Sequence, residues 1–277
     1  MLARLIYRVA ARIWRLGDVL AWLAGLPVLG PLLGKLFFSP RDNQAILIPV
    51  NEAIRGGESV VLPYALLSDL LARASHRVVL NECLCRRGEG CHAYPIDLGC
   101  LFLGGGAARI NTTLGRAVSV AEGQAHIERA LAAGLLPTIV HASLDAFVLQ
   151  LPFRKMLTVC FCCDCCCTIR KGLRMAPEVV GNTVTRLPGL TVSAGDACVG
   201  CDTCIDACPV GAIALVDGRA VIGAACKGCG RCAALCPTGA ITLDLDAEAD
   251  PRAQLWSLVE ARTDIGQRQP DQQSARH

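Results

Sequence analysis

Aromatic residues and charge are both scarce in this chain. Of its 277 residues, 4% are aromatic and 18% are charged, and the formal net charge is only +3. So small a positive charge gives little attraction to a phosphate backbone, and so few aromatic rings leave few platforms for stacked bases. The composition therefore argues against nucleic acid as a partner.

Two enzyme signatures are also missing. The chain has no C-x3-C-x2-C spacing, which argues against radical chemistry on S-adenosylmethionine, and no G-x-x-x-x-G-K-[ST] stretch for nucleotide hydrolysis. Hydrophobic residues are not scarce, because they make up 53% of the chain. That is enough to bury a core in one large domain or two modest ones.

Cysteine is the residue present in excess, with 18 copies. So many cysteines indicate either a disulfide protein or a metal protein, and their spacing distinguishes the two. Residues 198–209 read CVGCDTCIDACP and residues 226–237 read CKGCGRCAALCP, so the pattern C-x2-C-x2-C-x3-C-P occurs twice. Two zinc ribbons would explain neither the third cysteine of each run nor the proline after the fourth.

This duplicated run resembles the two-cluster bacterial ferredoxins, over about residues 190–245. The resemblance implies two 4Fe-4S clusters with crossed ligation, in which the fourth cysteine of each run binds the other cluster. One cluster would be held by Cys198, Cys201, Cys204 and Cys236, and the other by Cys226, Cys229, Cys232 and Cys208. Between the runs, Asp217 and Gly218 are flanked by apolar residues, which predicts a β-hairpin.

Short apolar runs precede the ferredoxin-like segment. Residues 45–50, 59–62, 77–80 and 137–142 predict strands, and amphipathic segments between some of them predict helices. Ser119 and Glu122 form a capping-box pattern that begins one such helix. The patterns predict a small α/β domain with a parallel sheet over residues 41–180, a ferredoxin domain over residues 181–247, and an α+β fold class for the whole chain.

Ten cysteines lie in the predicted α/β domain, in two groups that each follow a strand-like run. The groups are Cys83, Cys85, Cys91 and Cys100, and then, in the stretch CFCCDCCC, Cys160, Cys162, Cys163, Cys165, Cys166 and Cys167. A parallel sheet would bring both groups to the edge where its strands end. We predict at least one further metal centre here, and the alternatives are one cubane with spectator thiols, two cubanes, or a mixed iron or zinc site. A thiol-disulfide relay without metal is the competing interpretation.

Charged residues lie within and around these cysteine groups. Asp164, in the middle of the second group, is interpreted as a solvated turn residue or as an oxygen ligand to iron. The flanking cations are Arg86, Arg87, Arg170, Lys171 and Arg174. They either stabilise thiolates and an anionic cluster or form a solvated basic rim.

The whole combination is similar to a group of 4Fe-4S proteins found in anaerobic microbes. It consists of a CxCR stretch, a YPxDLGCL stretch, the multi-cysteine run and the two-cluster ferredoxin segment at the carboxyl-terminal end. The resemblance implies the architecture and the iron-sulfur cofactors, and it leaves the reaction open.

The segment 1–40 predicts a basic amphipathic helix followed by an apolar stretch. Arg4, Arg8, Arg12 and Arg15 recur at helical spacing, and residues 19–34 carry no charge. A helix over residues 19–34 would reach about 24 Å, short of a hydrocarbon core of about 30 Å. Contact with a membrane surface and a helical hairpin packed on the α/β domain are the two main interpretations, with a signal peptide as a third. Residues 248–277 predict a polar tail, disordered from about residue 263.

These observations predict an electron-transfer protein. Single electrons would pass through two 4Fe-4S clusters to or from the cysteine-rich domain or a redox partner protein. Because such clusters are usually assembled and protected in the cytoplasm, we expect a cytoplasmic location, at the inner face of the membrane if the first helices contact it. The alternative functions are an oxidoreductase, namely a reductase with a third metal centre fed by the ferredoxin domain, and metal or thiol handling.

Overall fold

The computed structural model describes residues 2–49, 54–55 and 61–266 of the chain. Its central element is a seven-stranded sheet with the strand order β5-β3-β4-β7-β6-β1-β8. These strands are β1 (Asn43–Leu47), β3 (Arg77–Leu80), β4 (Leu101–Leu103), β5 (Gly115–Ala117), β6 (Leu136–Ala142), β7 (Leu157–Cys162) and β8 (Val184–Arg186). A second sheet contains β2 (Ile54–Arg55), β9 (Leu190–Ala194) and β12 (Ile241–Leu245), and β10 (Ile213–Val216) pairs with β11 (Arg219–Ile222).

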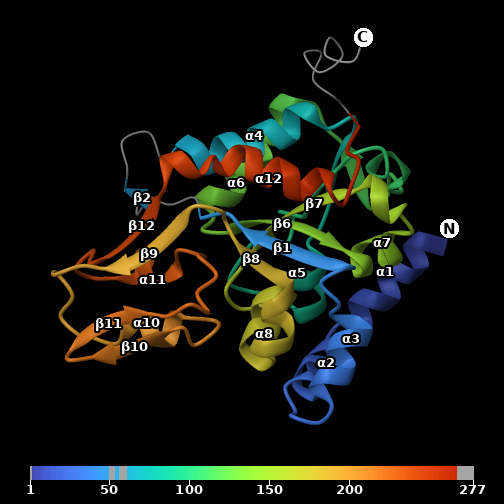
Figure 1. The fold of residues 1–277 in the computed structure, drawn as a ribbon. Coiled ribbons are helices and arrows are strands. Elements are labelled where there is room, and N and C mark those ends of the chain that lie inside the picture. Colours follow the sequence, from blue (N-terminus) through green and yellow to red (C-terminus); the bar gives the residue numbers. More distant parts are fainter. Residues whose placement is uncertain (1, 50–53, 56–60, 267–277) are drawn as a thin grey trace.

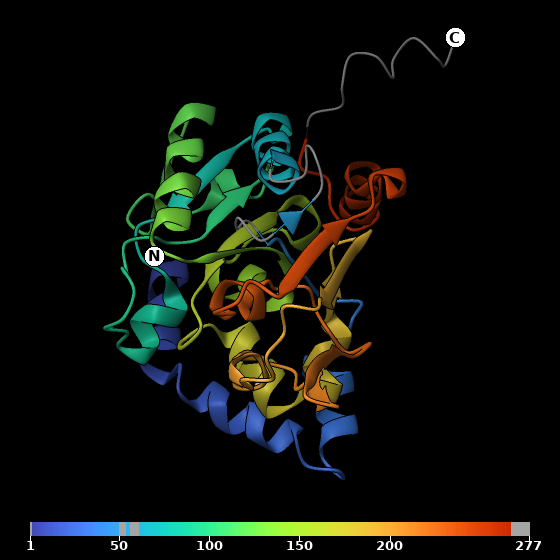
Figure 2. The ribbon, with the colours of Figure 1, turned by 90° about the vertical axis from the view of Figure 1, so that its left-hand side faces the viewer.

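Helices cover both faces of the central sheet (Figures 1 and 2). On one face lie α4 (Val61–Arg73), α6 (Val120–Ala132) and α12 (Pro251–Glu260). On the other lie α1 (Leu2–Ile13), α2 (Leu16–Ala24), α3 (Gly30–Phe37), α5 (Leu84–Glu89) and α8 (Thr168–Met175). The remaining helices are α7 (Ser143–Leu149), α9 (Pro177–Val180), α10 (Thr203–Ala207) and α11 (Arg231–Leu235), with short 3-10 turns at Ala107–Arg109, Phe153–Lys155, Gly181–Thr183 and Ala247–Ala249.

Alternation along the strands explains the two-sided packing. In β1, Ile46 packs into the core beneath α4 and α12, whereas Ala45 and Leu47 pack on the opposite side. In β7, Val159 belongs to the first core, whereas Cys160 borders both cores and lines a cavity on the second side. Successive side chains of a strand point to opposite faces, so every second residue of β7 faces the N-terminal helices and α8.

The sequence patterns predicted a parallel sheet, and this prediction is wrong, because the sheet is largely antiparallel. Among the described residues, β1 with β8 is its only parallel pair. Strands β3 and β7 nevertheless run in the same direction, because each is antiparallel to β4 between them. The chain segments that follow β3 and β7 therefore emerge at one edge of the sheet. The two cysteine groups meet there, although the predicted reason was wrong.

Several local predictions are confirmed. Ser119 caps α6 in a full capping box with Glu122, and Asp217 and Gly218 form the turn between β10 and β11 with positive φ. The predicted strand at residues 59–62 is wrong where the structure describes it, since Val61 begins α4, while residues 59 and 60 lie outside the described part.

The segment assigned to a polar tail contributes to the core. Leu255, Trp256 and Val259 of α12 are buried, and Ile265 beyond the helix is buried as well. Three apolar residues within one and a half turns are too weak a periodic signal to predict a helix from sequence. Residues 267–277 of the predicted tail lie outside the described residues.

The N-terminal helices pack on the α/β domain. Helix α1 contacts α5 and α7, α2 contacts α8, and α3 contacts α9. Tyr7 is buried and its hydroxyl donates to the carbonyl of Glu82 at 3.2 Å, while Trp14 packs directly on Gly88. Within the part of the chain that the structure describes, every helix is too short or too polar to cross a bilayer.

Candidate metal centres

The two cysteine runs of the C-terminal domain adopt the same loop twice. Each run places its third cysteine on a short helix, α10 or α11, and the two helices pack against each other. Each loop also contains a glycine with positive φ, Gly200 at 67° and Gly228 at 67°. A Cβ on Gly200 would lie 2.5 Å from the carbonyl oxygen of Gly218, so the loop closes around its thiols only with glycine there.

The two loops together surround two small cavities lined by thiols. The first is lined by Cys198, Cys201, Cys204 and Cys236, and the second by Cys226, Cys229, Cys232 and Cys208. Three thiols of each set come from one run and the fourth comes from the other run. The fourth cysteine follows the short helix of its own run, and this position turns it toward the neighbouring loop.

Backbone amides point at several of these sulfur atoms. The amide of Ala220 donates to Cys198 Sγ at 3.4 Å, and that of Ala212 donates to Cys208 Sγ at 3.2 Å. Hydrogen bonds from Ala220 and Gly200 lower the pKa of Cys198. Such donors stabilise negative charge on sulfur, as a thiolate or as a metal-bound ligand.

The ten upstream cysteines gather at the sheet edge where β3 and β7 end. Four of them, which we call the four-thiol group, are Cys91, Cys163, Cys165 and Cys166. Their Sγ atoms all lie within 4.8 Å of one another, with Cys91 and Cys165 3.7 Å apart. A tetrahedral ion with metal-sulfur bonds of about 2.3 Å places its sulfur atoms about 3.8 Å apart. The four-thiol group therefore has the dimensions of a single-ion site.

One member of the four-thiol group favours the thiolate. Burial opposes ionisation of Cys91, but hydrogen bonds from Cys166 and from the amides of Tyr94 and Ala93 outweigh it and lower its pKa. The pKa of Cys165 is raised to about 11, mainly by burial. Burial thus opposes a thiolate at Cys165 beside Cys91, and a bound divalent ion would offset that opposition.

The other six cysteines form what we call the six-thiol ring: Cys83, Cys85, Cys100, Cys160, Cys162 and Cys167. They line a cavity of about 190 Å³, together with Cys163 of the four-thiol group. Cys100 lies next to Leu101, which pairs with Val159, so the strand register brings Cys100 beside Cys160, and their Sγ atoms are 3.2 Å apart. Cys162 and Cys167 are 2.9 Å apart.

Contacts continue around the ring. Cys100 raises the pKa of Cys83 to about 12 through a hydrogen bond, and Cys83 in turn raises that of Cys85. Cys85 Sγ lies 3.4 Å from the hydroxyl of Thr168, which follows Cys167 in sequence. The six thiols therefore lie side by side along one part of the cavity wall.

Two arginines near the thiols are buried. Arg86 is 1% exposed, lines the same cavity, and donates to the carbonyl oxygens of Pro95, Leu98 and Phe161. Burial opposes its charge, but Cys83, Cys100 and Cys163 outweigh this and raise its pKa. Arg170 is 4% exposed, and its Nε and Nη2 have no hydrogen-bond partner among the described residues. The interpretation as a solvated basic rim is wrong for these two residues.

The remaining flanking cations differ. Arg87 and Arg174 are exposed, and Lys171 forms ion pairs with Asp18 and Glu89. Asp164 lies in the middle of the stretch CFCCDCCC and forms an ion pair with Arg231 of α11. It is therefore not the solvated turn residue that one interpretation expected, and its carboxylate is engaged by Arg231 instead of a metal ion. Sequence gave no indication of this pair, since its partners lie far apart in the chain.

The cavity wall also contains an acidic residue, Asp145, that no sequence motif indicated. Asp145 of α7 lines the cavity, and its buried Oδ2 has no hydrogen-bond partner among the described residues. Burial raises its pKa to about 6. No spacing or motif relates Asp145 to the cysteines, because α7 reaches the cavity only through the packing of the sheet.

Comparison with known proteins bears on one part of the chain. No curated protein gives a significant match. Residues 197–241 match the family described as the 4Fe-4S dicluster domain, and they include all eight cysteines of the duplicated run. This segment of the chain is therefore a ferredoxin-like 4Fe-4S domain.

Proposed function

We propose that this chain is an iron-sulfur electron-transfer protein whose dicluster domain holds two 4Fe-4S clusters with crossed ligation. One observation carries the proposal: each of two cavities is lined by three thiols from one run and a fourth from the other. The ligand sets are those that line the cavities, Cys198, Cys201, Cys204 and Cys236 for one, and Cys226, Cys229, Cys232 and Cys208 for the other.

The donor set fits the cofactor. Four thiols line each cavity, and backbone amides donate to Cys198, Cys208 and Cys226. A bound 4Fe-4S cluster supplies reversible one-electron chemistry, and the chain sets its potential by burial, hydrogen bonds and nearby charge. Cys232 and Cys204 are buried, whereas Cys201 is exposed. The first cluster would thus have the shorter path to a redox partner protein at the surface.

The second cluster would face the cysteine-rich domain. Cys229 packs with Cys160 and Ile169 against the core between the sheet and α8, and the charge of Arg170 acts on it. The ion pair between Asp164 and Arg231 joins the same two regions. We infer an internal route in which electrons pass between the surface-exposed first cluster, the second cluster and the metal centre in the cysteine-rich domain.

The crossed ligation is tested by Cys236→Ser in the full chain, purified without oxygen. The variant should damage the cluster at Cys198, Cys201 and Cys204 and leave the other one intact in resolved electron paramagnetic resonance spectra. Cys208→Ser is the matched control, and it should produce the reverse pattern. Loss of the Cys226 cluster on replacing Cys236 would show that ligation is not crossed.

The six-thiol cavity favours a second candidate function, a reductase fed by the dicluster domain. Its wall carries the unpartnered carboxyl oxygen of Asp145 beside Cys160 and Cys100. A carboxyl group held next to a redox centre can deliver a proton to a compound being reduced. Asp145→Asn should then abolish turnover of such a compound while single-electron reduction of the clusters by dithionite is retained.

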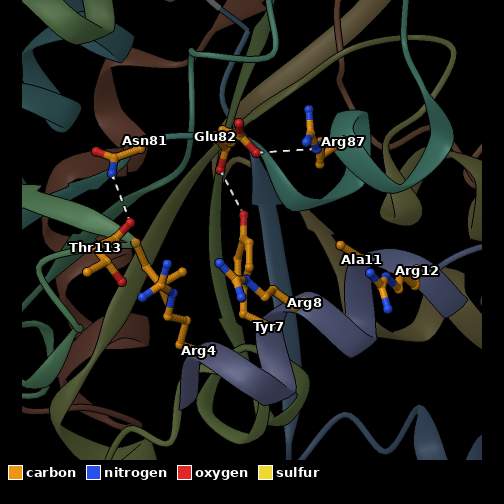
Figure 3. A pocket seen from close by; sticks show the side chains of 10 residues that line it. Arg4, Tyr7, Arg8, Ala11, Arg12, Asn81, Glu82, Arg87 and Thr113 are labelled. Atoms are coloured by element: carbon orange, nitrogen blue, oxygen red, sulfur yellow. Dashed lines mark hydrogen bonds and ion pairs between the residues drawn. The ribbon is translucent and has the colours of Figure 1, made fainter. Parts of the chain in front are cut away.

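We also propose that α1–α3 rest on an anionic membrane surface at the cytoplasmic face. Leu5, Val9 and Ile13 form an exposed stripe on α1, on the side away from buried Tyr7. Beside this stripe, Arg4, Arg8 and Arg12 line an open pocket of about 620 Å³, with Arg87 across from them (Figure 3). Tyr7 and Glu82 form the floor of this pocket.

Charge complementarity indicates a lipid surface as the occupant. Among the described residues, Arg4, Arg8 and Arg12 have no acidic partner, and α1–α3 contain a single acid, Asp18, which is paired with Lys171. The apolar surface continues onto α2 and α3, where Trp22, Leu32 and Leu36 are exposed. Apolar side chains next to unpaired arginines match the acyl and phosphate layers of an anionic bilayer.

A further inference from the structure

We propose that the six-thiol ring is a site for an iron-sulfur cluster, separate from the single-ion site of the four-thiol group. The inference deepens the proposed function by naming the third redox centre, and it rests on that proposal only for the source of electrons. Two centres of different size would then occupy the cysteine-rich domain, and all ten of its cysteines would be used.

The contacts among the thiols divide them into these two sets. Within the four-thiol group, Cys165 lies 3.7 Å from Cys91 and 3.4 Å from Cys166. Within the ring, the close pairs are Cys100 with Cys160 and Cys162 with Cys167. No close sulfur contact between the sets occurs among the described residues. Cys163 alone borders both, since it belongs to the four-thiol group and its side chain reaches the wall of the cavity.

The size of the cavity indicates a group of several atoms. A single tetrahedral ion binds four thiolates that nearly touch one another, as in the four-thiol group. The ring instead borders a cavity of about 190 Å³, with six thiols on its wall beside residues of α2, β1, β6 and α8. A liquid water molecule occupies about 30 Å³, so this cavity is several times too large for one ion. A polynuclear iron-sulfur cluster fits both the volume and the all-sulfur ligand set.

Charge points in the same direction. Arg86 lies in the cavity wall, is 1% exposed, and donates to three carbonyl oxygens. Its remaining polar neighbours are thiols, among them Cys163. No carboxylate pairs with it among the described residues. Burying a cation without an anion is costly, so an anionic partner is expected beside it. An iron-sulfur cluster bound by thiolates carries net negative charge and supplies that partner.

The N-terminal segment covers part of the cavity. Trp14, Ala21 and Phe38 lie over it, and Trp14 packs so closely on Gly88 that a Cβ there would overlap the indole. Apolar cover of this kind limits the access of water to the ring, and limited access protects a cluster and tunes its potential. The position of α1–α3 thus has a role in the site besides any contact with a membrane.

Two disulfides are the competing occupancy, because Cys100 with Cys160 and Cys162 with Cys167 are already close. That arrangement would leave Cys83 and Cys85 without partners and Arg86 without an anion. It also predicts no iron and no sulfide in the ring. The iron and sulfide content of the protein therefore distinguishes disulfides from a cluster.

The test uses the full chain purified without oxygen, with iron, zinc and acid-labile sulfide counted per chain. Two cubanes account for about eight sulfides. Wild type should contain more than this, and Cys100→Ala with Cys160→Ala should return sulfide to about eight while the spectra of the dicluster domain persist. Cys91→Ala should lose about one metal ion and no sulfide, as expected for a single-ion site.

Failure of this inference is distinguishable from failure of the proposed function. A wild-type sulfide content of about eight, or one unchanged by the double replacement, would overturn the ring as a cluster site and leave the dicluster assignment standing. Because the double variant could fold poorly, Cys85→Ser gives a second readout. Apoprotein of that variant, titrated with ferrous iron and sulfide, should bind less of both than wild type, and equal uptake counts against the ring.

Discussion

Asp164, in the middle of the cysteine-dense turn after β7, forms an ion pair with Arg231, the first residue of α11. The pair therefore joins the four-thiol group to the loop that carries Cys229 and Cys232. Tyr94, which follows Cys91, also donates a hydrogen bond to Asp164. Three segments far apart in sequence meet at one carboxylate, and each of them carries cysteines.

Replacing Asp164 should loosen this junction. In Asp164→Asn, the partly buried Arg231 loses its counter-charge, and we expect the free energy of unfolding to fall by about 1 kcal/mol. Urea denaturation of the anaerobic protein measures the change, and a double-mutant cycle with Arg231→Met isolates the pair. The exposed pair of Asp196 and Arg219 is the control, and Asp196→Asn should leave stability unchanged. An equal effect of both replacements would contradict a special role for Asp164.

Arg170 should control the potential of the second cluster. Its buried guanidinium acts on Cys229, so Arg170→Met removes a positive charge and should make that cluster harder to reduce. For a one-electron couple, a loss of about 1.4 kcal/mol of stabilisation lowers the potential by about 60 mV. A redox titration monitored by electron paramagnetic resonance measures the reduction potential of this cluster. Arg174→Met, on the exposed side of the same helix, should leave the potential where it was.

Two glycines provide a matched test of the loop geometry. Gly200 and Gly211 both have positive φ, but only at Gly200 would a Cβ meet another atom, the carbonyl oxygen of Gly218 at 2.5 Å. Gly200→Ala should therefore lower the iron content of the Cys198 cluster, whereas Gly211→Ala should cost only the backbone strain of about 1 kcal/mol. Iron analysis and thermal unfolding compare the two. Similar losses at both positions would mean that strain, not the contact, limits the loop.

Membrane attachment is tested with vesicles of defined composition. Wild type should sediment with vesicles rich in phosphatidylserine and less so with phosphatidylcholine alone, because the arginines of α1 bind anionic headgroups. Val9→Glu with Ile13→Glu should abolish sedimentation, and Val221→Glu, an exposed apolar residue of β11, should not. If wild type stays in solution with anionic vesicles, α1–α3 serve only to cover the thiol cavity.

Much of the dicluster domain could be predicted from sequence, because the residues that define it lie close together along the chain. The ligand spacing, the glycines and the hairpin turn at Asp217 all lie within one short segment, and each residue type has one physical reason to be there. The family match at residues 197–241 agrees with that interpretation. The cysteine-rich domain was predictable only in outline, since the meeting of its two cysteine groups depends on strand directions. A run of branched residues does not reveal whether its neighbours are parallel, and the structure makes them antiparallel.

The division of the ten cysteines into a ring and a four-thiol group was beyond sequence reasoning. Adjacent residues such as Cys162 and Cys163 belong to different sets, because the chain leaves β7 at that point and its side chains cease to alternate. The burial of Arg86 and the position of Asp145 likewise follow from packing across the sheet, and no spacing along the chain reports them.

The ring also sets an order of events during assembly. Cys100 and Cys160 are separated by 60 positions and meet only through the pairing of β4 with β7, whereas Cys198, Cys201 and Cys204 sit in one loop. A nascent chain can therefore present the dicluster thiols with little folded structure, but it cannot form the ring before the sheet has closed. Once filled, a centre at the ring would tie β4 to β7 as a cross-link does, so its removal should first loosen the middle of the sheet and then release the helices that cover it.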